Sequence, residues 1–109
     1  MNDERAIIDE LLRAGAEGRP VVLATVIATR GSVPRHAGSK LIIDPADGTM
    51  VGTIGGGCGE ADVIVAARDV ARTGIPQTVR VELLDSVDSF SPAVCGGVMH
   101  IFVERVASH

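Results

Sequence analysis

A run of glycines around one cysteine, residues 55–60 (GGGCGE), carries the strongest chemical signal in this sequence. Glycine lets the backbone approach a ligand closely, and free N–H groups at the start of a helix favour an anion. The run is not a Walker A loop, because no Gly-Lys-Ser/Thr follows, and it does not complete the G-x-G-x-x-G pattern. A tight turn explains the glycines equally well, but the cysteine favours a ligand site. The candidate contacts here are Gly55, Gly56, Gly57, Cys58 and Glu60.

Two thiols could supply nucleophilic or soft-metal chemistry. Cys58 lies at the expected start of a helix, whose dipole favours the thiolate, and a thiolate is a nucleophile, a soft-metal ligand or a sulfur acceptor. Cys95 precedes Gly96 and Gly97, just before the last expected strand. Neither cysteine belongs to a C-x-x-C pair, so a structural zinc site is not expected. Burial as a small apolar side chain is the alternative for both.

The segment 30–40 (RGSVPRHAGSK) carries three basic residues and no acidic one. The whole chain has a net charge of −4, so this positive segment indicates a specific small anion rather than a polymer. Arginine suits bidentate contact with phosphate, and a solvated turn is the alternative. Glu60 either caps its helix or accepts hydrogen bonds from a heterocyclic ligand. The candidate contacts of the basic segment are Arg30, Ser32, Arg35 and Lys40.

The composition excludes several other function classes. The chain has 109 residues with no Trp, no Tyr and two Phe, so it lacks the aromatic platforms on which nucleic-acid bases stack. Its negative charge also disfavours a phosphate-backbone binder. No apolar stretch approaches the ~20 residues of a membrane helix. The N-terminus lacks the basic start and apolar run of a signal peptide, so we expect a cytoplasmic protein without a disulfide.

The hydrophobic pattern places the candidate residues at the ends of helices and strands. Apolar positions at helical spacing predict one helix near residues 3–18 and a second over 61–74, which stops at Gly74. Runs of β-branched residues predict strands, the first of them central and buried, and residues 45–48 predict a four-residue hairpin turn. We expect residues 1–109 to form a single mixed α/β (α+β) domain, with two helices on a mixed sheet of about five strands. The strands are expected at 21–29, 40–44, 49–54, 78–84 and 95–106, with His100 pointing outward from the last.

Taken in order, the motifs resemble the N-terminal domain of the XdhC/CoxI family, which comprises accessory proteins for the maturation of xanthine dehydrogenase and related molybdenum hydroxylases. The resemblance runs from about Leu11 to Glu104. Many family members continue into a Rossmann-type domain, whereas this sequence contains no G-x-G-x-x-G. A single-domain member, one partner of a two-subunit protein and a fragment all fit that difference. The motifs are Arg30-Gly-Ser-x-Pro-Arg, Gly38-x-Lys40, Gly52-x-Ile54-Gly-Gly-Gly-Cys-x-Glu60 and Cys95-Gly-Gly.

The resemblance implies a chaperone that binds the molybdenum cofactor, as molybdopterin or a dinucleotide form. Such a chaperone protects the cofactor during its sulfuration and delivers it to an apo-hydroxylase of the xanthine dehydrogenase or CO dehydrogenase type. The resemblance implicates Cys58 as the metal contact, through the molybdenum of the cofactor. It also implies a cysteine desulfurase-type sulfur donor, while exposed strand edges make a homodimer a further expectation. An accessory role is favoured over a catalytic one; the alternatives are a thiol or persulfide carrier and a ligand-free interaction subunit.

Overall fold

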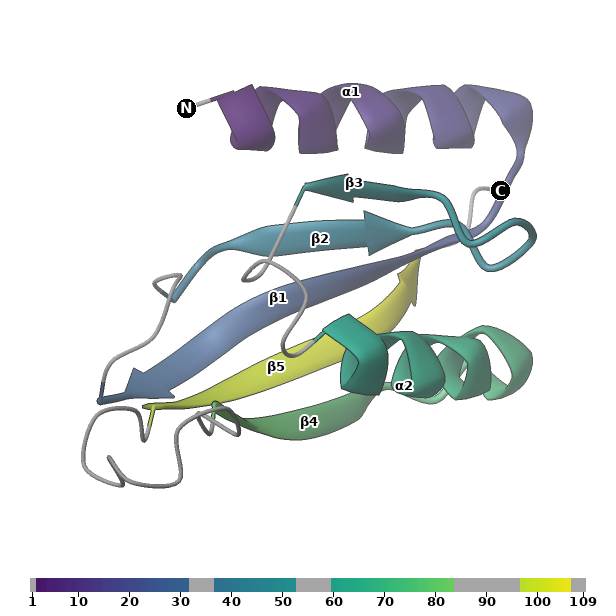
Figure 1. Cartoon of the computed structure of the whole chain (residues 1–109). Helices are drawn as coiled ribbons and strands as arrows, with labels where there is room; N and C mark the ends of the chain where they lie inside the picture. The colour runs from purple at the N-terminus through teal and green to yellow at the C-terminus, as the bar shows by residue number, and fades with distance from the viewer. Residues whose placement is uncertain (1, 32–36, 53–59, 84–96, 107–109) are drawn as a thin grey trace.

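The computed structural model describes residues 2–31, 37–52, 60–83 and 97–106. They form a five-stranded sheet in the order β3-β2-β1-β5-β4, with one helix on each face (Figure 1). The elements follow one another along the chain as the hydrophobic pattern predicts. They are α1 (Asn2–Glu17), β1 (Val21–Arg30), β2 (Lys40–Ile43), β3 (Met50–Gly52), α2 (Glu60–Thr73), β4 (Gln77–Leu83) and β5 (Gly97–Val106). Neither of these helices is long and apolar enough to cross a membrane.

The sheet differs from the expected mixed sheet, because every strand pairing among the described residues is antiparallel. A helix that connects two strands usually links parallel neighbours. Here α2 connects β3 to β4, and these two strands run in the same direction but are the two outermost strands of the sheet. The crossover therefore creates no parallel pair.

Each helix buries its apolar side against a different part of the sheet. α2 packs on β1, β4 and β5, and its predicted inner side chains Val63, Ala67 and Val70 are fully buried there. α1 packs mainly on β2 and β3, on the opposite face. β1 is the central strand of the sheet, as predicted, and it contributes side chains to the cores on both faces. The smaller core, under α1, contains Ile7, Ala14, Val21 and Ile42.

Part of the sheet has no described helix over it. On the α1 side, the helix makes its main contacts with β2 and β3, so no described element covers most of β1, β5 and β4. Side chains along β5 alternate between buried ones under α2 and half-buried ones on this side. His100 lies on this side, as the alternation predicts. We call this surface of β1, β5 and β4 the open face; its β5 side chains are Val98, His100, Phe102 and Glu104.

Glycines end both helices. Gly18 and Gly74 have φ angles of 67° and 76°, a left-handed conformation that favours glycine. The N–H of Gly74 donates to the carbonyl of Val70 at 2.8 Å, which confirms Gly74 as the stop of α2. Arg105 of β5 packs on Gly74, and its guanidinium donates to the carbonyl of Ala71 at 3.0 Å. The sheet thus caps the C-terminus of α2 with an arginine.

The connection between β2 and β3 is longer than the predicted four-residue turn. It comprises residues 44–49, because β2 ends at Ile43 and β3 begins at Met50. The carboxylate of Asp44 accepts the N–H of Ala46 at 2.9 Å, and the N–H of Asp44 donates to the carbonyl of Thr49 at 2.8 Å. Asp44 therefore organises the turn rather than ending the strand.

Candidate functional site

The chain segments that carry the sequence motifs leave and enter the sheet at one edge. β1, β3 and β4 run toward this edge and β2 and β5 start from it, because each strand is antiparallel to its neighbours. α2 also begins on this side, since only residues 74–76 separate its end from the start of β4 at the opposite edge. We call the line of strand ends on this side the motif edge, on the left in Figure 1, and the line of strand ends on the opposite side the far edge.

Most of the predicted contacts belong, in the sequence, to the segments that connect elements at the motif edge. The segments concerned are 32–36, 53–59 and 84–96, which lie outside the described residues. The metal contact predicted for Cys58 is among them. Within the described ranges, no group of three or more His, Cys, Asp and Glu could hold a metal ion. The predicted contacts outside the described residues are Ser32, Arg35, Gly55, Gly56, Gly57, Cys58, Cys95 and Gly96.

The remaining predicted contacts belong to strands and a helix that begin or end at the motif edge, on both sides of the sheet. Arg30 pairs with Val98 and Lys40 pairs with Thr25, which places both basic side chains on the α1 side. Glu60 begins α2, which covers the other side. A ligand that met all three residues would therefore have to lie across the edge itself. Gly97, the last of the predicted contacts in the described part, pairs with Leu83 at the same edge.

A bulge in β1 directs Arg30 to the α1 side. The register with β5 shifts between Val26 and Ala28, so Ile27 is the extra residue. Before the bulge, the even-numbered side chains of β1 pack under α2. After it, Ala28 pairs with His100, so the even-numbered side chains lie on the open face. Without the bulge Arg30 would point to the α2 side. Nothing in the sequence around Ile27 marks this change.

Two glycines of the motifs, Gly52 and Gly38, disfavour a side chain for different structural reasons. Gly52 has a φ of 91°, and a Cβ there would lie 2.7 Å from the carbonyl oxygen of Lys40 and 3.0 Å from Cδ1 of Ile7. Gly38 has a φ of 98°, but a Cβ there would meet nothing within 4 Å in the described part of the chain. Gly52 is thus required by both conformation and close contact, and Gly38 by conformation alone. These structural requirements explain both glycines without a bound ligand.

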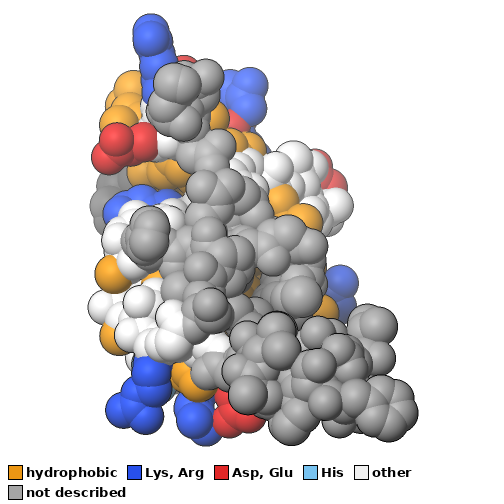
Figure 2. Space-filling model, turned by 60° about the vertical axis from the view of Figure 1, so that its left-hand side comes forward, with side chains coloured by type: hydrophobic (Ala, Val, Ile, Leu, Met, Phe, Trp, Pro, Cys, Tyr) orange, Lys and Arg blue, Asp and Glu red, His pale blue; other side chains and the backbone are white. Residues whose placement is uncertain are grey.

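Basic side chains on the α1 side of the sheet have few partners among the described residues. Arg30 is exposed and makes no ion pair with any residue in the described ranges. Lys40 donates to the carbonyl of Gly38 at 3.1 Å. Arg80 makes an ion pair with Glu82 at 2.6 Å, and both side chains are about half exposed. Figure 2, which looks onto the motif edge, shows Lys and Arg side chains at its lower end beside an acidic one.

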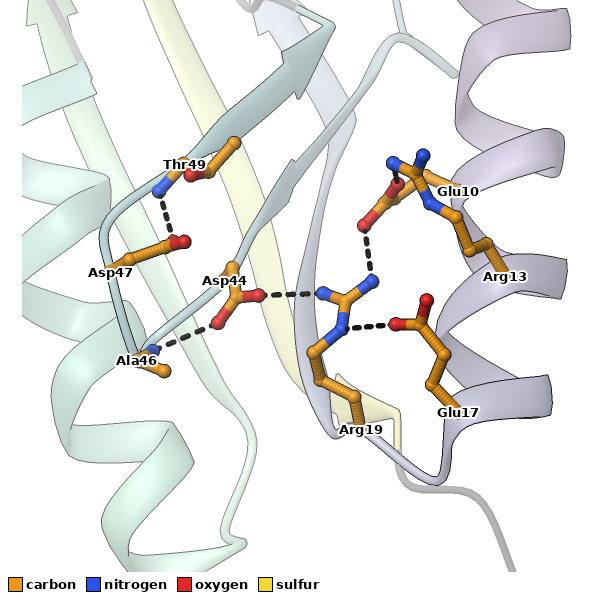
Figure 3. A network of polar contacts seen from close by, with 8 residues as sticks. All are labelled: Glu10, Arg13, Glu17, Arg19, Asp44, Ala46, Asp47 and Thr49. Atoms are coloured by element: carbon orange, nitrogen blue, oxygen red, sulfur yellow. Dashed lines mark hydrogen bonds and ion pairs between the residues drawn. The ribbon is translucent and has the colours of Figure 1, made fainter.

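The far edge holds a dense network of charges around Arg19 (Figure 3). Its guanidinium donates to Glu10 and Glu17, both at 2.9 Å, and to Asp44 at 2.6 Å. Glu10 also accepts from Arg13. These contacts tie α1 to the connection between β2 and β3. We call this set of residues the Arg19 network.

The Arg19 network shifts the pKa values of Arg19 and Glu10. Hydrogen bonds to Glu17, Glu10 and Asp44 raise the pKa of Arg19. Hydrogen bonds from Arg19 and Arg13 hold the pKa of Glu10 below its ordinary value, although burial acts in the other direction. Glu10 and Asp44 are only 7% and 8% exposed, so removing Arg19 would leave two buried carboxylates without this partner.

The sequence-based prediction missed this network, although one signal was present. Glu10 falls three residues after Ile7 and four before Ala14, on the side of α1 that is buried. A carboxylate at such a position needs a partner. The partners of Glu10 are Arg13, three residues farther along α1, and Arg19, which lies beyond the end of the helix. The spacing indicates Arg13, but nothing in the sequence links Glu10 to Arg19 or Arg19 to Asp44.

Comparison with known proteins identifies the family. Residues 14–82 match the model of the XdhC and CoxI family. The chain belongs to this family. It is 34% identical over 110 residues to a protein of Bacillus subtilis (strain 168) described as a probable xanthine dehydrogenase subunit, across 97% of this chain and 32% of that protein. It is 29% identical over 79 residues to the molybdenum cofactor insertion chaperone PaoD of Escherichia coli (strain K12), across 72% of this chain and 24% of that protein.

A solved structure shares the fold of this XdhC and CoxI family chain. The crystal structure of a xanthine dehydrogenase from Bacillus halodurans matches with a TM-score of 0.75 and 31% identity, over 97% of this chain and 31% of that one. The family resemblance that the motifs predict is therefore confirmed. The chain spans about a third or less of the length of these relatives.

Proposed function

We propose that this chain binds the molybdenum cofactor at the motif edge and helps to deliver it to a molybdenum hydroxylase. The observation that supports the proposal is that the strands and the helix that flank the motif-bearing segments end or begin at one edge of the sheet. Membership of the XdhC and CoxI family, and the similarity to a chaperone named for molybdenum cofactor insertion, support the choice of ligand.

The chemistry of the described residues fits this ligand. The cofactor carries a phosphate, for which Arg30 offers a charged donor at the motif edge. Lys40 offers a second cation on the same side of the sheet, farther from the edge. The N-terminus of α2 offers backbone N–H groups from the other side. When bound, the cofactor supplies a molybdenum–dithiolene centre, and a thiolate is a suitable soft donor for it.

The remaining contacts complete the proposed site. We assign Cys58 to the metal contact and Glu60 to the hydrogen-bond donor edge of the pterin. Cys95 provides a second thiol from the segment before β5. The glycines and polar residues beside them let the backbone approach the ligand and donate N–H groups. These supporting contacts are Gly55, Gly56, Gly57, Ser32, Arg35, Gly96 and Gly97.

The proposed role is that of a carrier, in which the chain's residues bind, orient and release the cofactor without chemical turnover. The partners would be an apo-hydroxylase of the xanthine dehydrogenase or CO dehydrogenase type and a cysteine desulfurase-type sulfur donor, both in the cytoplasm. The similarity to a probable xanthine dehydrogenase subunit supports the first of these partners.

Anaerobic ultrafiltration with the isolated molybdenum cofactor tests the proposal. The chain should retain the cofactor stoichiometrically, and Cys58→Ala or Arg30→Ala should weaken binding by about tenfold or more, the loss of one charge-assisted or soft-ligand contact. Arg72→Ala is the matched control, because Arg72 is exposed in the last turn of α2, toward the far edge. Its binding should equal that of the natural chain.

Two results would overturn the proposal. Binding that is indifferent to both Cys58 and Arg30 would remove the motif edge as the site. A folded chain that retains no cofactor would remove the function itself for this chain. If such a chain instead carried a persulfide on Cys58 or Cys95, the thiol-carrier alternative would replace it.

A further inference from the structure

The open face carries charged side chains near the motif edge that none of the motifs includes. β5 lies between β1 and β4, so each of its residues has a register partner on both sides. The two rows nearest the motif edge, read from β1 to β4, are Ala28–His100–Arg80 and Arg30–Val98–Glu82.

Strand geometry brings three of these side chains around one point. Neighbouring strands lie about 4.8 Å apart and side chains on one face repeat about every 6.8 Å, so the α-carbons of Arg30 and Arg80 are roughly 12 Å apart across Val98. Both are long and exposed, and they approach from opposite sides. His100 stands behind Val98 on the same strand. A small ligand over Val98 would therefore be within reach of two guanidinium groups and one imidazole.

We propose that Arg30, His100 and Arg80 form an oxyanion subsite over Val98, which takes a phosphate group. Guanidinium groups match phosphate through parallel N–H donors, and the imidazole adds another donor. The half-buried Val98 provides an apolar floor. The phosphate of the molybdenum cofactor and free phosphate share this chemistry; the first source rests on the function proposed above.

Glu82 gives the subsite its counter-charge when no ligand is bound. Its carboxylate pairs with Arg80 at 2.6 Å, but the two side chains are 47% and 59% exposed. Exposed ion pairs contribute little to stability, so an arriving phosphate can displace the carboxylate from Arg80. Removing the charge of Glu82 should therefore strengthen phosphate binding, while removing either arginine should weaken it.

The distribution of charge on the open face distinguishes this subsite from an ordinary solvated surface. Antiparallel sheets often turn one polar face to water, and such a face needs no ligand. The next row of the open face, one step away from the motif edge, carries no charged side chain. Its neighbour on β2, outside the open face, is Lys40. In a chain with net charge −4, the arginines that the described strands place on this face both lie in the two rows at the motif edge. The uncharged row is Thr25–Phe102–Thr78.

Titration with inorganic phosphate, followed by backbone amide NMR, tests the subsite on the full chain. Shifts should map to residues 28–30, 80–82 and 98–100. Arg30→Gln and Arg80→Gln should each weaken binding about tenfold, the usual effect of losing a hydrogen bond to a charged group. Glu82→Gln should tighten binding by about threefold, because one repelling charge is gone.

Two matched controls separate the subsite from general charge effects. Glu104→Gln removes a carboxylate from the same face of β5, but on the far side of the Phe102 row. Arg72→Gln removes an exposed arginine from the last turn of α2. Both should leave phosphate binding unchanged. The double variant Arg80→Gln/Glu82→Gln should bind more tightly than Arg80→Gln alone, because Arg80→Gln leaves Glu82 unpaired beside the ligand.

The same variants, tested with the molybdenum cofactor, decide the source of the phosphate. Weaker cofactor binding by Arg80→Gln supports the cofactor as the ligand, and weaker phosphate binding alone supports free phosphate. If Arg80→Gln and Glu82→Gln change neither affinity, the subsite is wrong, while cofactor binding that depends on Cys58 would leave the proposed function intact. Phosphate binding without cofactor binding would do the reverse.

Discussion

The two edges of the sheet use charge in opposite ways. At the far edge, Arg19 contacts three carboxylates, and two of them are buried. At the motif edge, Arg30 has no ion-pair partner in the described part of the chain, and Arg80 has only the exposed Glu82. Paired charges at the far edge hold α1 to the sheet. At the motif edge, the arginines make few ion pairs with described residues, so we expect them to contribute little to the stability of the fold and to be available to the proposed ligand.

The largest expected effect concerns the rigid part of the motif edge. Gly52→Ala should lower the free energy of unfolding by about 3 kcal/mol, because the new Cβ combines a strained φ with a close approach to the Lys40 carbonyl. Gly38→Ala has only the conformational cost, about 1 kcal/mol. Urea denaturation of both variants measures the difference. Equal losses would mean that the close contact of Gly52 has no energetic consequence.

The second-largest expected effect is a difference in thermal stability between matched substitutions at the two edges. Arg19→Met should lower the midpoint of thermal unfolding by several degrees, because it leaves the buried carboxylates of Glu10 and Asp44 without their main partner. Arg30→Met makes the same chemical change at the motif edge and should leave the midpoint nearly unchanged. Calorimetry of the two variants tests the comparison. If both midpoints fall equally, Arg30 has a structural role and the contrast between the edges is wrong.

A smaller effect appears in the pH dependence of stability. The pKa of Glu10 is lowered in the folded chain, so its contribution is complete above the ordinary carboxyl pKa of ~4.3 and is lost as the pH falls through the folded value. Glu10→Gln should therefore be less stable than the natural chain at neutral pH, and the difference should shrink on acidification. Denaturation curves between neutral pH and pH 3 would show this, with the exposed Glu4→Gln as a control that keeps the natural slope. A difference that stays constant with pH would mean that Glu10 acts through packing and not through its charge.

The sequence alone predicts the elements well because their signals are local. Helical spacing identifies the inner side of α2, and Gly74 marks its end through its backbone preference. The antiparallel order of the sheet is not local, because it depends on α2 carrying the chain from one edge strand to the other. The sequence also names Arg30 and Lys40 as candidates from their types. It cannot place both on one face, because the side on which Arg30 lies depends on the bulge at Ile27, and no turn-forming residue in the sequence indicates that bulge.

The smallest effect on stability belongs to the residues with the largest proposed effect on binding. Arg80→Gln removes an exposed side chain whose described partner is also exposed, so it should change the free energy of unfolding by less than about 0.5 kcal/mol. Urea denaturation measures this on the samples used for the phosphate titration. A loss of binding with unchanged stability would show that the charge of Arg80 serves a ligand. A loss of stability comparable to that of Arg19→Met would instead make Arg80 part of the fold, and the contrast between the edges would then rest on Arg30 and Lys40 alone.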